Sequence, residues 1–106
     1  MNKLGLQIFD RVTEFIGSLS KQERLKTASR IDSIREGDFE SVYVKMIRGP
    51  IKELIVKDSR FIFCIENNTM FVFHAFTKKT AKTPQKEIMR SEALYSLLIR
   101  QVAQNK

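Results

Sequence analysis

Residues 73–84 read FHAFTKKTAKTP, and in this stretch the chain passes from a strand to its last helix. Residues 70–76 are predicted as a strand that has His74 near its end. Thr83 is predicted as the N-cap of the helix, with Pro84 at the first helical position, where a missing amide costs nothing. Three lysines lie between strand and helix: Lys78, Lys79 and Lys82. A buried core segment rarely needs this chemistry, whereas a phosphate-binding site does.

Upstream of this stretch, alternation of apolar and polar residues predicts three further strands, at 42–47, 51–57 and 60–66. Gly49-Pro50, Asp58-Ser59 and Asn67-Asn68 are predicted as the turns between strands, since asparagine and glycine tolerate positive φ. The strands at 60–66 and 70–76 are apolar on both faces. Each face of the predicted sheet must therefore be covered.

The first 19 residues carry apolar side chains at helical spacing: Ile8, Phe9, Val12, Phe15, Ile16 and Leu19. Leu4, Leu6 and Ile8 also alternate, as in a short strand, but the helix is favoured. Ser20 and Glu23 have capping-box spacing and predict a second helix that ends near Gly37. The predicted fold class is α+β: an N-terminal helical hairpin, an antiparallel sheet of three to four strands and a C-terminal helix, in one domain spanning 1–106.

Composition fits a single globular domain of 106 residues with one cysteine and a net charge of +7. Residues 1–41 hold seven basic and seven acidic side chains, whereas residues 42–106 hold twelve and five, so the second part carries the whole surplus. A charge surplus confined to one region indicates a surface for an acidic polymer or protein. No apolar run reaches the roughly 20 residues of a membrane helix, and a cytoplasmic location is expected.

Three parts of the chain together resemble the HigB-like, phage-related branch of the RelE/ParE toxin superfamily. They are IRGPIKEL at 47–54, Arg60 at the start of a strand, and HAFTKKTAKTPQKEI at 74–88. The likeness extends from about Val12 to the last helix. It implies the toxin of a type II toxin–antitoxin pair, usually an endoribonuclease that cuts mRNA in the ribosomal A site. It also implies a helix-turn-helix antitoxin of the HigA type as partner, and no cofactor.

RNA cleavage without a metal needs proton transfer and cations that stabilise the phosphate. One histidine and one cysteine are too few for the usual zinc sites, so no metal is expected. With the family likeness, the candidate catalytic residues are Arg60, His74 and Lys79. The candidate RNA or phosphate contacts are Lys45, Arg48, Lys52, Lys78 and Lys82.

Each candidate also has a structural interpretation. His74 fits a half-buried histidine bonded to a backbone carbonyl, Arg60 fits an ion pair with Glu53, and the lysines fit a solvated turn. Glu53 itself is predicted to be structural, and Cys64 and the phenylalanines to lie in the core.

The chain departs from the family pattern at two positions. Ile55 stands where an arginine commonly follows the Glu-Leu pair, and Lys52 stands where an aromatic commonly precedes it. Two other functions therefore stay open. One is a ParE-like inhibitor of a protein target such as DNA gyrase, and the other is a non-catalytic nucleic-acid-binding phage accessory protein.

Overall fold

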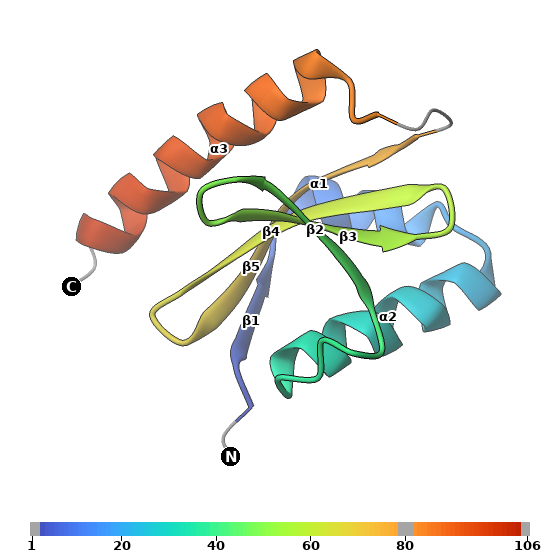
Figure 1. Ribbon diagram of the computed structural model, residues 1–106. Helices are drawn as coiled ribbons and strands as arrows, with labels where there is room; N and C mark the ends of the chain where they lie inside the picture. Colours follow the sequence, from blue (N-terminus) through green and yellow to red (C-terminus); the bar gives the residue numbers. More distant parts are fainter. Residues whose placement is uncertain (1–2, 79–81, 105–106) are drawn as a thin grey trace.

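The computed structural model describes residues 3–78 and 82–104. Within them, the strands and helices follow in the order β1 (Gly5–Ile8), α1 (Asp10–Gly17), α2 (Lys21–Arg35), β2 (Tyr43–Arg48), β3 (Ile51–Val56), β4 (Ser59–Glu66), β5 (Thr69–Thr77) and α3 (Gln85–Gln104) (Figure 1). None of these helices combines the length and the apolar character that crossing a membrane requires.

The strands form one five-stranded sheet in the order β1-β5-β4-β3-β2. β1 runs parallel to β5, and every other pairing is antiparallel. The predicted turns at Gly49-Pro50 and Asn67-Asn68 are confirmed, whereas the turn between β3 and β4 lies at Lys57-Asp58, one residue before the predicted Asp58-Ser59. Asn67 and Asn68 have φ of 49° and 60°, which suits a two-residue hairpin. Gly49, at φ 54°, closes the β2–β3 hairpin in the left-handed region that glycine adopts without strain.

Helices cover both faces of the sheet, as its doubly apolar strands predicted (Figure 1). On one face, α1 and α2 bury Val12, Ile31 and Ile34 against Leu54, Phe61 and Val72. On the other face, Leu98 of α3 packs with Ile62, Cys64 and Phe73. Burial raises the pKa of the Cys64 thiol to about 12, as expected of a core cysteine. The two faces are called the α1/α2 face and the α3 face below.

The predicted N-terminal helix is wrong at its beginning, and the predicted antiparallel sheet lacks a strand. Residues 5–8 form β1, and α1 begins only at Asp10. The alternation of Leu4, Leu6 and Ile8 therefore outweighs the helical spacing, because β5 offers an unpaired edge along 69–72. The sheet is consequently mixed and has five strands. The start of α2 is confirmed: the Ser20 hydroxyl accepts from the Glu23 amide at 3.2 Å.

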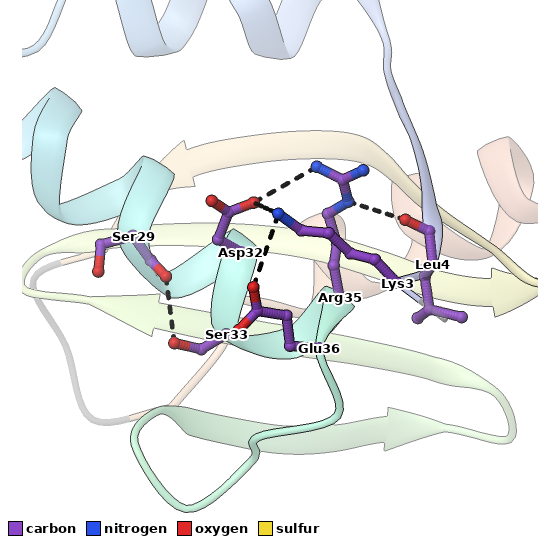
Figure 2. A network of polar contacts seen from close by, with 7 residues as sticks. All are labelled: Lys3, Leu4, Ser29, Asp32, Ser33, Arg35 and Glu36. Atoms are coloured by element: carbon purple, nitrogen blue, oxygen red, sulfur yellow. Dashed lines mark hydrogen bonds and ion pairs between the residues drawn. The ribbon is translucent and has the colours of Figure 1, made fainter. Parts of the chain in front are cut away.

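A network of polar contacts joins the start of β1 to the last turns of α2 (Figure 2). The Leu4 amide donates to the Arg35 carbonyl at 2.9 Å, and Arg35 Nε donates back to the Leu4 carbonyl at 2.9 Å. Arg35 also reaches Asp32 at 3.3 Å. Lys3 pairs with Asp32 and Glu36, but these side chains are exposed, so their ion pairs contribute little. Arg35 is therefore the main tie between the strand and the helix.

Replacement of Arg35 by alanine is expected to lower the free energy of unfolding by about 1.5 kcal/mol, the usual size for a partly buried hydrogen bond from a charged donor. The midpoint of thermal unfolding should fall by about 5–10 °C. Lys26→Ala, on the exposed side of the same helix, is the matched control and should change little. Equal midpoints for the two variants would show that the Arg35 side chain does not help to hold β1 against α2.

Candidate functional site

The strand register places two rows of side chains next to each other on the α3 face. Directly opposed residues of paired strands point to the same side of a sheet. One row runs across four strands as Lys45, Glu53, Ile62 and His74. The neighbouring row runs as Tyr43, Ile55, Arg60 and Phe76. Three of the predicted site residues, Lys45, Arg60 and His74, are thereby brought onto one surface.

A β-bulge in β5 is what places His74 on that surface. Ile62 is opposite His74 and Phe63 is opposite Val72, so Phe73 is an extra residue in β5. Before the bulge, Met70 and Val72 pack in the α1/α2 core. After it, Phe76, an even-numbered residue like them, packs on the α3 face. Without the extra residue, His74 would lie on the opposite face.

A buried carboxylate lies at the centre of the site. Glu53 is 0% exposed, and its Oε2 accepts from the Thr83 hydroxyl at 2.9 Å. Thr83 Oγ1 in turn accepts from Lys78 Nζ at 3.3 Å. Glu53 Oε1 has no hydrogen-bond partner among the residues described. The chain Glu53–Thr83–Lys78, called the Glu53 chain below, links β3, the end of β5 and the segment that opens α3.

Two predictions about this segment are wrong. Lys78 does not lie on a solvated turn, since it is 4% exposed. The N-cap position falls on Pro84 and not on Thr83, because the Pro84 carbonyl accepts the first intrahelical bond. The Thr83 hydroxyl donates to the buried Glu53 carboxylate instead. α3 begins at Gln85, and the Pro84 carbonyl accepts from the amides of Glu87 and Ile88.

Burial lowers the pKa of Lys78, because the ammonium loses water. The negative charge of Glu53 acts in the opposite direction, and the positive charges of Lys45 and Arg60 add to the lowering. Glu53, Lys45 and Arg60 are therefore close enough to Lys78 to act on it electrostatically. A lysine in such surroundings gives up its proton more readily than an exposed one.

His74 is held by a carboxylate instead of the backbone carbonyl that one interpretation predicted. Its Nε2 lies 2.9 Å from Glu87 Oε1 in the first turn of α3, and both side chains are largely buried. The ring also lies against Phe76, with centroids 5.5 Å apart. On another side, His74 lines a shallow hollow of about 380 Å³ with Arg11, Glu14, Phe15, Ala75 and Arg90. The imidazole is thus oriented from one direction and reachable from another.

Arg60 does not form the predicted ion pair with Glu53. One of its guanidinium nitrogens donates to the carbonyls of Lys57 and Ser59, at 2.6 and 3.0 Å, and its buried Nε has no partner among the described residues. Arg60 and Glu53 thus each retain one buried polar atom without a hydrogen-bond partner among the described residues. Because such atoms cost stability, the site is not arranged for stability alone.

The remaining candidate cations lie around this cluster in different ways. Arg48 pairs with Glu92 of α3 at 2.9 Å. Lys52 donates to the Pro50 carbonyl at 3.4 Å. Lys82 is exposed just before α3. Lys79 lies outside the described residues, so its predicted catalytic role is not placed. Within the described ranges, no group of three or more His, Cys, Asp or Glu side chains is arranged to hold a metal.

Sequence reasoning missed two members of the site, Thr83 and Glu87. Thr83 was interpreted as a helix cap, and Glu87 lies in the first turn, where acidic residues are common for electrostatic reasons. Their partners, Glu53 and His74, are 30 and 13 residues away in sequence.

The five-stranded mixed sheet has α1 and α2 on one face and α3 on the other, with β1 parallel to β5, which defines an α+β fold. The fold is similar to a chain from the crystal structure of the RelB–RelE antitoxin–toxin complex of Methanococcus jannaschii. The TM-score is 0.57 at 9% identity, over 66% of this chain and 87% of that one.

The chain belongs to the Gp49-like family of phage-derived proteins (DUF891), whose sequence profile matches residues 14–96. No curated protein is close enough in sequence to count as a relative. The matched region contains the sheet rows, the Glu53 chain and the His74–Glu87 pair.

Proposed function

We propose that this chain is the toxin of a type II toxin–antitoxin pair, and that it acts as a metal-independent, ribosome-dependent mRNA endoribonuclease in the cytoplasm. A helix-turn-helix antitoxin of the HigA type would be its partner. The RelE-type fold supports this proposal, as does a solved neighbour that comes from an antitoxin–toxin complex. The HigB-like sequence at 47–54 and 74–88 supports the particular branch of the superfamily.

The observation that carries the proposal is that two cations and a histidine bonded to a carboxylate lie on one face of the sheet. Lys45, Arg60 and His74 come from three strands and share that face through the register. Neighbouring strands lie about 4.8 Å apart, so the two rows span roughly 15 Å, enough for two or three nucleotides of an extended strand. A fold alone does not specify chemistry, but this arrangement favours phosphodiester cleavage.

In the proposed reaction, the 2′-hydroxyl of RNA attacks the adjacent phosphorus and the bond to the 5′-oxygen breaks, leaving a cyclic phosphate. A base must take the proton of the 2′-hydroxyl, and an acid must protonate the leaving oxygen. Arg60 and Lys45 are placed to stabilise the added negative charge of the phosphate. His74 transfers a proton, and Glu87 holds its ring in one orientation.

The Glu53 chain has a supporting role in this proposal. It holds the end of β5 against the segment that opens α3, and thereby fixes both His74 on β5 and Glu87 on α3. Lys78 is buried next to the cations that would bind phosphate, so binding of RNA would change its electrostatic surroundings. Lys82, exposed just before α3, would extend the positive surface beyond the sheet. Lys79 is kept as a proposed catalytic residue.

Inducible expression in a bacterial host tests the proposal. Expression of the wild type should stop growth and translation, and mapping of RNA 5′ ends should show new cuts that need ribosomes. The double variant Arg60→Ala/His74→Ala should relieve both effects, whereas Arg100→Ala, a matched loss of charge near the end of α3, should not. Normal growth on wild-type expression would refute a toxin. Growth arrest with intact mRNA and DNA-damage signalling would favour a gyrase inhibitor instead.

A further inference from the structure

Tyr43 is the most exposed large apolar side chain described, at 79%. It lies on β2, the edge strand of the sheet, and belongs to the same row as Ile55 and Arg60. On this face α3 packs mainly against β5 and β3, and Tyr43 stays exposed on the edge strand. An exposed aromatic on a flat sheet face beside cations is the arrangement that single-stranded nucleic acids use for base stacking.

We propose that Tyr43 and Ile55 form a platform on which one base of the RNA stacks, while Lys45 and Arg60 bind the adjoining phosphates. This inference rests on the proposed function and identifies a substrate contact that sets the position of the RNA. Tyr43 and Ile55 are cross-strand neighbours about 5 Å apart, and Lys45 follows Tyr43 on the same face about 7 Å along the strand. A ring, an aliphatic side chain and two flanking cations thus lie within the span of one or two nucleotides.

The charges favour RNA over a protein as the occupant. The charged side chains of the two rows that reach the surface are Lys45 and Arg60, both positive, whereas the acidic Glu53 is fully buried below them. Ile55 adds to the argument, because it lies directly opposite Tyr43 and is only part-buried. It therefore supplies apolar surface beside the Tyr43 ring. A base plane fits this surface better than a phosphate does.

Binding of a fluorescein-labelled single-stranded RNA of about ten nucleotides tests the platform. Tyr43→Ala should weaken binding by about tenfold or more, the usual worth of one stacked base, and Tyr43→Phe should bind like the wild type. A second comparison uses RNAs in which one nucleotide lacks its base. When the missing base is the stacked one, the wild type should bind the RNA more weakly, whereas binding by Tyr43→Ala should not change. Equal binding of all three proteins to the intact RNA would overturn the proposal.

A spectroscopic measurement tests the platform without any change at Tyr43. The chain has two tyrosines and no tryptophan, so in the variant Tyr95→Phe the fluorescence comes from Tyr43 alone. Stacking of a base should quench this fluorescence as RNA is added. Unquenched emission during saturating binding would refute stacking, whatever the stability of Tyr43→Ala.

The outcomes separate this inference from the proposed function. Cleavage of mRNA with no effect of Tyr43 would refute the platform and leave the nuclease intact. RNA binding that depends on Tyr43, without cleavage by the wild type, would uphold the platform and refute the nuclease. Loss of antitoxin binding by Tyr43→Ala, with unchanged RNA binding, would assign this surface to a protein partner and overturn the platform.

Discussion

His74→Ala is expected to slow RNA cleavage by about a hundredfold to ten-thousandfold, the range that a positioned proton-transfer group contributes. Glu87→Gln should cause a smaller loss, because the amide still bonds to the ring and holds it in place but carries no negative charge beside it. The measurement is the single-turnover rate of cleavage of ribosome-bound mRNA, which isolates the chemical step from binding and product release. The expected order is wild type, then Glu87→Gln, then His74→Ala.

Glu92→Gln is the matched control for these variants. Glu92 lies one turn further along α3 and pairs with Arg48 at a more exposed position. Removing a surface ion pair of this kind costs little, so cleavage should change by less than about threefold. If His74→Ala cleaves as fast as this control, the histidine is structural, and the proton transfer must be assigned to Lys78 or Lys79.

Glu53→Ala is expected to lower the free energy of unfolding by about 3 kcal/mol, because it leaves the Lys78 ammonium buried without a compensating charge. The midpoint of thermal unfolding should fall by about 10–20 °C. Glu40→Ala removes a carboxylate from an exposed turn and is the matched control. A fall of less than about 2 °C in Glu53→Ala would show that the carboxylate does not hold the site together.

The loss of unfolding free energy in Glu53→Ala should become smaller as the pH rises. Burial already lowers the pKa of Lys78, and Glu53 opposes that effect. Without Glu53, the pKa falls further, so the folded variant binds fewer protons than the unfolded chain below the usual lysine pKa. Stability then rises with pH, and the difference from the wild type should shrink as the pH approaches about 10. The double variant Glu53→Leu/Lys78→Met, which removes both buried charges, should recover most of the loss.

The local features of the fold were predictable because they depend on neighbouring residues. The Ser20 cap, the Asn67-Asn68 turn and the doubly covered strands each follow from a short stretch of sequence. β1 was not predictable, because residues 5–8 form a strand only by pairing with the edge of β5, which lies more than 60 residues later in the sequence. Propensity favours a helix at residues 4–8 only while that partner is ignored.

The site was predicted in part, and for a related reason. Lys45, Arg60 and His74 could be named from residue type and family likeness, but the residues that orient them could not. The partners of Glu53 and His74 are set by how α3 docks on the sheet, which no pattern within β3 or β5 reveals. The burial of Lys78 was hidden for the same reason, since a lysine-rich turn ordinarily faces water.

The bulge at Phe73 makes the spacing of residues in β5 as important as their identity. His74 and Phe76 share a face with Glu53 only because one extra residue reverses the alternation that begins at Met70. Deletion of one residue between 71 and 74 would leave the remaining side chains unaltered in kind and send those that follow to the other side of the sheet. Homologous strands should therefore be aligned on the position of this irregularity. A relative that keeps the histidine and lysines but lacks the extra residue would have the same residue types without their arrangement on one face of the sheet.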